Sequence, residues 1–180
     1  IKIPFIILAG VFPALSSLYI KSFKHSVMLY EKSFYYMLAI SFPIVSGLFL
    51  LADKIILFIY DAQFANSILA LKILCFSLIL SFINYLMGYL LTAINKQGSF
   101  TGIVAFSTAI NIVLNLILIP KYSYIGASWA TIISEIISFI MLYYFTCKNG
   151  YKAHVLKLAL KPLISAIIMI IFIILFKNLH

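Results

Sequence analysis

The chain has 180 residues, of which 65% are hydrophobic and 9% are charged, and its formal net charge is +9. A soluble domain is roughly 45–50% apolar and about 25% charged, and a fold of about this size buries only about 70% of the surface of its extended chain. The apolar excess must face lipid. The composition therefore excludes a water-soluble fold and predicts an integral membrane protein.

Apolar runs of membrane-spanning length follow one another along the chain. A bilayer core about 30 Å thick takes roughly 20 apolar residues as a helix, and a chain inside that core must satisfy its own backbone hydrogen bonds. The runs are too long for strands and show no alternation of period two. We therefore predict an all-α, polytopic transmembrane helical bundle of about six spans. The six runs cover about 1–19, 34–60, 66–94, 100–119, 124–146 and 155–176.

The lysines lie between the apolar runs, so the positive charge indicates an orientation in the membrane and no nucleic-acid partner. Eight of them fall in the segments 20–33, 95–99 and 147–161. Lys121 and Lys177 lie on the other side of the membrane under the same alternation. Since cytoplasmic loops carry the excess of lysine, we predict that loops 20–33, 95–99 and 147–154 are cytoplasmic.

Polar side chains recur at helical spacing in three consecutive spans, which gives each of these spans one polar face. Run 66–94 carries Ser77, Ser81, Asn84, Gly88 and Thr92. Run 100–119 carries Thr101, Thr108, Asn111 and Asn115. Run 124–146 carries Ser128, Thr131, Glu135 and Ser138. Two interpretations are open: small and hydroxyl residues that let helices pack closely, or faces that line a water-filled path for a polar substrate.

Glu135 is an acidic residue inside the predicted span 124–146. Because a charge at the bilayer centre costs at least ~2.5–3.5 kcal/mol, this carboxyl group must be paired, protonated or in contact with water. It is a candidate for proton or cation coupling or for a gate contact. The alternative is a structural carboxyl group that is hydrogen-bonded to a neighbouring helix. Asp53 and Lys72 lie near one end of two successive spans, where they can reach the interface or each other.

No motif in the sequence predicts a cofactor, a metal site or catalysis. Cys75 and Cys147 belong to no CxxC or Cys/His cluster, so we interpret both as packing residues. The sequence has no GxxxxGK[ST] motif for nucleotide hydrolysis. Its four acidic residues are scattered. We therefore expect a protein that is not an enzyme.

The stretch 115–135 reads NLILIPKYSYIGASWATIISE. It resembles the signature of the polysaccharide and O-antigen flippases, which belong to the multidrug/oligosaccharidyl-lipid/polysaccharide exporter superfamily. The matching features are Asn115, Ile119-Pro120, Tyr122, Gly126-Ala127, Ala130-Thr131 and Ser134-Glu135. Segments 12–19, 29–38, 51–74 and 94–103 resemble the same family in the same order, so the resemblance covers nearly the whole chain. Asp61 departs from the family pattern, which has glycine there.

The resemblance implies two six-helix lobes around a central cavity. This chain would supply the C-terminal lobe (1–146) and an additional transmembrane helix (147–180). Because the chain starts without methionine inside an apolar run, with no signal-peptide pattern, we expect it to continue a longer protein whose first lobe is missing here.

The resemblance also implies a function for the intact protein, which would flip a polyprenyl-linked oligosaccharide across the cytoplasmic membrane by alternating access. The expected partners are the lipid bilayer, the lipid-linked oligosaccharide and the first lobe. The cavity of this family is cationic and attracts a diphosphate, which makes Lys2 a candidate phosphate contact, since an ammonium attracts a diphosphate more strongly in low dielectric.

Two other functions are open at this point. A drug or cation exporter of the same superfamily would share the fold and favour an acidic or aromatic cavity. A membrane enzyme of polysaccharide assembly would need a large extramembrane loop or clustered catalytic residues, and the sequence has neither. Under the flippase interpretation, the candidate substrate or coupling residues are Glu135, Asn115, Asn111, Asn84 and Lys2.

Overall fold

The computed structural model describes residues 2–60 and 62–177, and this part of the chain consists of helices joined by short connections, with no strand. The predicted all-α class is confirmed. The elements are α1 (Lys2–Lys21), α2 (Phe23–Ile59), the 3-10 helix η1 (Ala62–Phe64), α3 (Ser67–Ala93), α4 (Gln97–Lys148) and α5 (Val155–Lys177).

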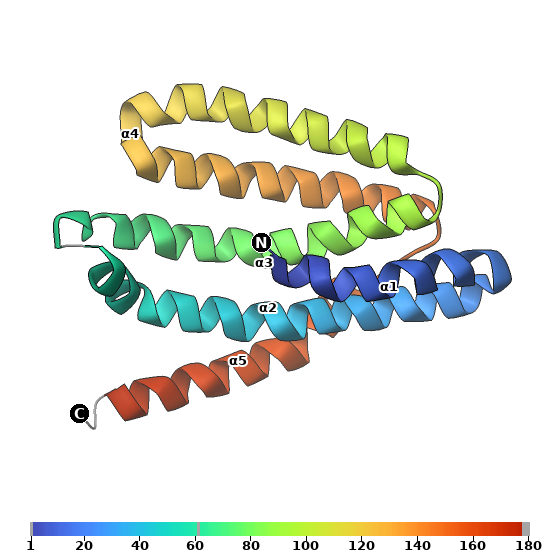
Figure 1. The fold of residues 1–180 in the computed structure, drawn as a ribbon, viewed down its shortest axis with the longest axis horizontal. Coiled ribbons are helices and arrows are strands. Elements are labelled where there is room, and N and C mark those ends of the chain that lie inside the picture. Colours follow the sequence, from blue (N-terminus) through green and yellow to red (C-terminus); the bar gives the residue numbers. More distant parts are fainter. Residues whose placement is uncertain (1, 61, 178–180) are drawn as a thin grey trace.

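Helix α4 is a helical hairpin and not one straight rod (Figure 1). Its 52 residues would extend about 78 Å as a straight helix, against a bilayer core of about 30 Å. The chain reverses at Ser123, whose φ of 53° and ψ of −137° are non-helical. We call residues 97–122 the first arm of α4 and residues 124–148 the second arm. The arms contain the predicted spans 100–119 and 124–146.

The number of membrane-spanning helices differs from the prediction of six. Four helices in the described part of the chain are long and apolar enough to cross a bilayer, namely α2, α3, α4 and α5. Two of the predicted spans are the two arms of α4, and the described apolar stretch of α1 is Ile6–Lys21. The multi-pass character of the chain is nevertheless clear from these helices.

The predicted loop 20–33 is wrong, because α2 begins at Phe23, directly after Ser22. This part of the helix is amphipathic: Ser26, Tyr30 and Ser33 recur at helical spacing and are buried, whereas Lys24 and Lys32 are exposed. Hydropathy alone predicts a loop for such a segment, because its outer face is charged. The packing of its inner face against the bundle stabilises it as a helix.

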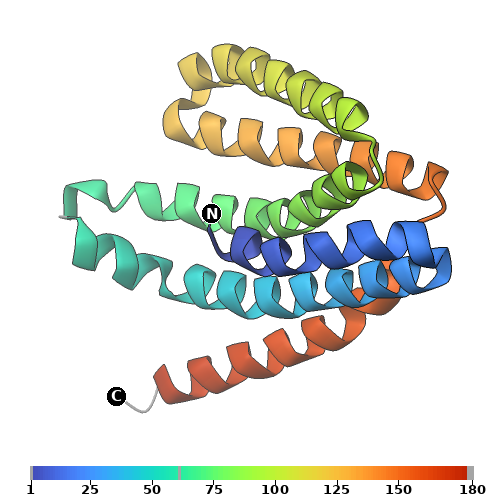
Figure 2. The same ribbon diagram turned by 45° about the vertical axis from the view of Figure 1, so that its right-hand side comes forward.

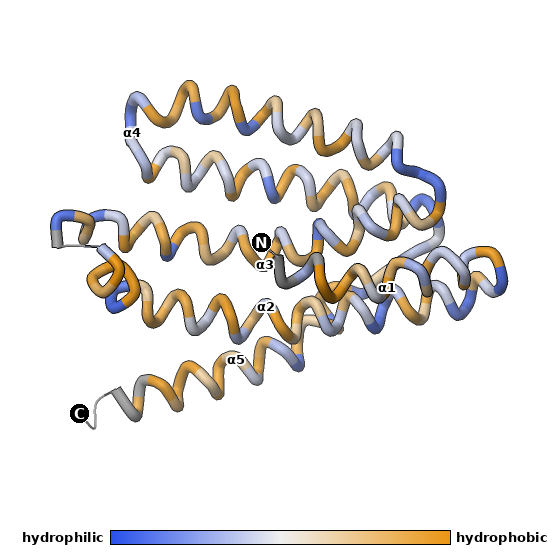
Figure 3. Tube along the Cα trace, in the orientation of Figure 1, coloured by the Kyte–Doolittle hydropathy of each residue, from blue (hydrophilic) through white to orange (hydrophobic). Residues whose placement is uncertain are grey.

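Helix α3 lies at the centre of the bundle and packs against α1, α2 and α4, while α5 packs against α2 (Figure 1). The core lies between α2 and α3, where Phe34, Met37, Leu86 and Leu90 are fully buried. Many large apolar side chains are exposed on the outside, as is expected for surfaces that face lipid. Figure 3 shows that hydrophobic residues cover most of each helix and that hydrophilic residues gather at the turns.

Two groups of turns lie at opposite ends of the bundle. The junction of α1 with α2, the turn 94–96 and the segment 149–154 lie at one end in both views (Figures 1 and 2), whereas η1 and the reversal within α4 lie at the other. The lysine-rich segments therefore share one end, which we call the lysine-rich end. Near the opposite end, the Lys72 ammonium lies 2.8 Å from the Asp53 carboxylate, which confirms that these two residues can reach each other.

Tyr151 fixes the connection between α4 and α5 at the lysine-rich end. Its side chain is fully buried, its hydroxyl lies 2.9 Å from Ser26 Oγ, and its ring meets the Tyr30 ring edge to face at 5.7 Å. Burial raises the pKa of the Tyr151 phenol, and the hydrogen bond with Ser26 lowers it by a smaller amount. The neutral phenol of Tyr151 therefore anchors the connection between α4 and α5 in the bundle.

We expect Tyr151→Phe to lower the free energy of unfolding by about 1 kcal/mol at neutral pH, because it removes one buried hydrogen bond. A phenol whose pKa is higher in the folded state stabilises fully below its unfolded pKa of about 10, and this contribution is lost as pH rises through the folded pKa. The variant should therefore lose less stability above pH ~10 than the unmodified protein. Thermal unfolding in detergent across this pH range measures both effects, and identical alkaline losses would contradict the assignment.

Candidate functional site

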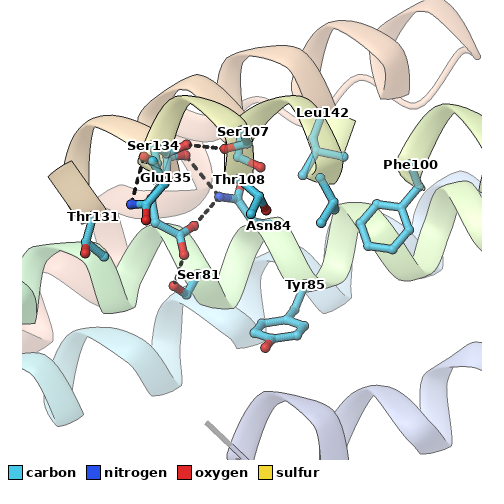
Figure 4. Close-up of a pocket in the computed structure, with 13 residues that line it drawn as sticks. Ser81, Asn84, Tyr85, Phe100, Ser107, Thr108, Thr131, Ser134, Glu135 and Leu142 are labelled. Atoms are coloured by element: carbon cyan, nitrogen blue, oxygen red, sulfur yellow. Dashed lines mark hydrogen bonds between the residues drawn. The ribbon is translucent and has the colours of Figure 1, made fainter. Parts of the chain in front are cut away.

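The polar faces of three helical segments meet in one pocket between α3 and the two arms of α4 (Figure 4). Its volume is about 430 Å³. The lining residues are Ser81, Asn84, Tyr85, Phe100, Val104, Ser107, Thr108, Asn111, Thr131, Ser134, Glu135, Ser138 and Leu142. Seven of these thirteen belong to the polar faces that the sequence indicates, so the three faces point toward one another and not toward lipid.

Glu135 links the second arm of α4 to α3. Its carboxylate accepts a hydrogen bond from Ser81 Oγ at 2.7 Å on one oxygen and from Asn84 Nδ2 at 2.6 Å on the other. The same Asn84 nitrogen also lies 3.1 Å from the backbone oxygen of Glu135. Both partners are buried. The carboxyl group therefore has the interhelical hydrogen bonds of the structural alternative and also lines the pocket.

Asn84 is only half satisfied by this arrangement. Its side chain is 8% exposed, and its Oδ1 is buried with no hydrogen-bond partner among the described residues. An unsatisfied buried acceptor costs about 1–3 kcal/mol. The amide nitrogen faces the Glu135 carboxyl group, and the amide oxygen is the atom left without a partner.

Asn111 and Asn115 form a second polar network along the first arm of α4. Asn111 Nδ2 donates to Ser134 Oγ at 3.1 Å across the hairpin. Asn115 Nδ2 donates to Asn111 Oδ1 at 2.9 Å. Asn111 lines the pocket, whereas Asn115 does not and acts on it only through Asn111.

Several other polar residues satisfy their own helix. Thr131, Ser128 and Thr92 donate to backbone oxygens four residues before them, at 3.0, 3.0 and 2.9 Å. This pattern is the ordinary one for hydroxyl residues inside apolar helices. Thr101 is exposed and does not line the pocket. These hydroxyl groups are thus satisfied within their own helices, and Thr131 also lines the pocket.

Two glycines allow the close approach that brings the pocket walls together. A Cβ at Gly88 would lie 2.7 Å from Phe100 Cζ, so only glycine lets that ring pack directly on α3. A Cβ at Gly126 would lie 2.7 Å from the carbonyl carbon of Leu118, which places the two arms of α4 in backbone contact. Small residues have this role at membrane-helix interfaces.

Ser107 and Ser134 are pocket residues that the sequence analysis did not select as candidates. Ser107 Oγ donates to the backbone oxygen of Ser134 at 2.8 Å, and Ser134 Oγ donates to that of Ala130 at 2.7 Å. Ser107 lies four residues before Asn111, so helical spacing already places it on the same face. The spacing was a usable signal for Ser107.

The remaining candidate, Lys2, is the first residue of α1, but its side chain lies outside the described residues. Among the residues whose positions are described, no three His, Cys, Asp or Glu side chains lie close enough together to hold a metal ion. Glu135 and Tyr85 are the titratable residues among those lining the pocket.

Comparison with known proteins finds two membrane proteins that are similar to this chain. The chain is 28% identical over 141 residues to the uncharacterized membrane protein MJ1068 of Methanocaldococcus jannaschii, an alignment that covers 78% of this chain and 28% of that protein. It is 27% identical over 99 residues to the probable low-salt glycan biosynthesis flippase Agl15 of Haloferax volcanii, covering 55% of this chain and 21% of that protein.

The chain thus spans about a quarter of the length of the curated relatives that it matches. No protein-family model matches it, and no solved structure does. Together with the long apolar helices, these similarities identify a multi-pass membrane protein that resembles a flippase.

Proposed function

We propose that this chain is part of a membrane transporter that flips a lipid-linked glycan across the cytoplasmic membrane by alternating access. The observation that carries the proposal is the polar pocket around Glu135, which lies inside a bundle whose outer surface is apolar. A polar cavity between helices is where a membrane transporter binds substrate or a coupling ion. The similarity to the flippase Agl15 supports glycan as the cargo.

Within this proposal, residues 1–146 form the C-terminal lobe of the transporter and residues 147–180 contribute an additional transmembrane helix. The first lobe would close the pocket on its open side. The lysine-rich end lies in the cytoplasm, because basic residues flanking membrane helices concentrate there. Lys2, at the start of α1, contacts the phosphate groups of the substrate.

In this scheme Glu135 is the coupling residue, and the orientation of the Asn84 amide depends on whether the Glu135 carboxyl group is charged. The charged carboxylate selects the amide orientation in which Nδ2 donates to it. A protonated carboxyl group has an O–H to donate, so the amide turns by half a rotation and the orphaned Oδ1 accepts that hydrogen bond. Protonation of Glu135 therefore changes the hydrogen bonds between α3 and the second arm of α4. The network of Asn111 and Asn115 stabilises the first arm of α4, which is the opposite wall of the pocket.

One observation favours a second function, export of a drug or another organic cation. The charged residue lining the pocket is acidic, and an acidic cavity attracts cations rather than phosphates. A cationic wall supplied by the first lobe would reverse this preference. No observation in the described residues favours the membrane-enzyme alternative.

The full-length protein in proteoliposomes tests the proposal. A fluorescent lipid-linked oligosaccharide is placed in the membrane, and its protection from an external sugar-modifying enzyme is followed with and without a pH or sodium gradient. The expected result is movement of the sugar between leaflets that depends on the protein. Accumulation of small cationic dyes, with no movement of the sugar, would instead identify a drug exporter.

A further inference from the structure

A second cleft lies between the second arm of α4 and the start of α5, away from the pocket around Glu135. Its volume is about 480 Å³, and its lining residues are Phe139, Tyr143, His154, Val155, Leu156 and Lys157. It exists because α5 packs against α2 and leaves α4 after the segment 149–154 (Figure 1). The cleft opens beside that segment, at the lysine-rich end.

The walls of the cleft divide into an apolar part and a polar part, which consists of His154 and Lys157. The rings of Phe139 and Tyr143 stack nearly in parallel, with centroids 5.9 Å apart and planes 17° apart. The Tyr143 hydroxyl donates to the backbone oxygen of Ala153 at 3.0 Å, which ties this ring to the segment 149–154. His154 and Lys157 are exposed at its mouth.

Lysines surround this cleft in the sequence. Lys148, Lys152 and Lys161 flank the cleft in the sequence, and residues 136–180 contain no Asp or Glu. Among the described side chains, Lys72 forms an ion pair with Asp53, and this pair lies near the other end of the bundle. The lysines therefore favour a group that carries negative charge.

We propose that this cleft binds an anionic phospholipid of the bilayer. The headgroup phosphate lies between His154 and Lys157, and an acyl chain lies along Phe139 and Tyr143 toward the membrane interior. Basic pockets between membrane helices at the cytoplasmic side bind anionic headgroups, and each basic residue near the surface contributes about 1 kcal/mol. A soluble phosphate would leave the aromatic wall uncovered, so the combination of walls favours a lipid. The inference does not depend on the proposed transport function.

Photo-crosslinking of the full-length protein in phosphatidylcholine vesicles tests this site. A diazirine-bearing phosphatidylglycerol is activated by light, and the crosslinked peptides are located by mass spectrometry. The expected result is labelling on both walls, around residues 139–143 and 154–157. Unlabelled phosphatidylglycerol should displace the probe, whereas phosphatidylcholine and soluble glycerol phosphate should not.

Charge variants separate a built site from general surface attraction. Lys157→Gln should reduce labelling about five-fold, the equivalent of about 1 kcal/mol for one lysine, and Lys157→Arg should preserve it. His154→Gln removes a hydrogen-bonding ring from the cleft and should also reduce labelling. Lys152→Gln is the matched control, because it removes the same charge from the same segment without lining the cleft. An equal loss in the control, even labelling of all lipid-facing helices, or displacement by glycerol phosphate would overturn the proposal. Helical circular dichroism verifies that each variant is folded.

Discussion

Replacement of Glu135 by alanine is expected to lower the free energy of unfolding by about 1–3 kcal/mol, because two interhelical hydrogen bonds lose their acceptor. Such bonds contribute about 0.6 kcal/mol on average and up to about 1.7 kcal/mol in a membrane protein. The variant also leaves the buried Ser81 hydroxyl without its partner, and the Asn84 amide keeps only the backbone oxygen of residue 135. Thermal unfolding of the purified protein in detergent measures the change.

Glu135→Gln separates the structural role of this residue from its role in coupling. The glutamine oxygen still accepts one of the two hydrogen bonds, so the loss of stability should be about 1 kcal/mol or less. An amide does not titrate, however, so transport in proteoliposomes should lose its dependence on the gradient. Transport that still follows the gradient in this variant would return Glu135 to a purely structural role.

Ser138→Ala is the matched control for both measurements. Ser138 lines the same pocket, one turn after Glu135, and it makes no interhelical hydrogen bond in the described part of the chain. Its replacement should change stability by no more than about 0.5 kcal/mol. Loss of gradient dependence in this variant as well would mean that coupling responds to any change in the pocket.

Gly126→Ala is expected to destabilise the α4 hairpin by about 1–3 kcal/mol, and by more if the backbone does not move. The added methyl group would collide with the carbonyl group of Leu118, whose carbon is 2.7 Å from the position of the new Cβ. A backbone carbonyl has no alternative rotamer, so the two arms must separate. This separation also enlarges the distance between Asn111 and Ser134, which close the pocket wall.

The control is Gly102→Ala in the first arm of the same helix. An added Cβ there meets no atom within 4 Å, so the variant should be stabilised by up to about 1 kcal/mol through the higher helix propensity of alanine. Opposite shifts in the melting temperatures of the two variants support the close contact of the arms. Equal shifts would show that Gly126 is replaced without cost and that the arms do not approach so closely.

Much of the fold follows from the sequence because a bilayer restricts what a chain can do. Apolar runs in lipid must be helices, and the observed α3 (Ser67–Ala93) differs by one residue at each end from the predicted run 66–94. The polar faces also followed from the sequence, since helical period alone decides which side chains share a face. The helical period did not show that residues 23–33 belong to α2, because the outer face of this segment is charged although its inner face is buried.

The sequence by itself thus determined that this is a helical membrane protein with a carboxyl group on a polar helix face. Only the tertiary structure decided what that carboxyl group meets: Ser81 and Asn84 lie 54 and 51 residues away in the chain. It also decided that Asn115 supports Asn111 rather than lining the pocket. The physical reason is that helical period fixes directions within one helix, whereas the rotation of one helix against another depends on packing between distant segments, such as the glycine contacts at Gly88 and Gly126.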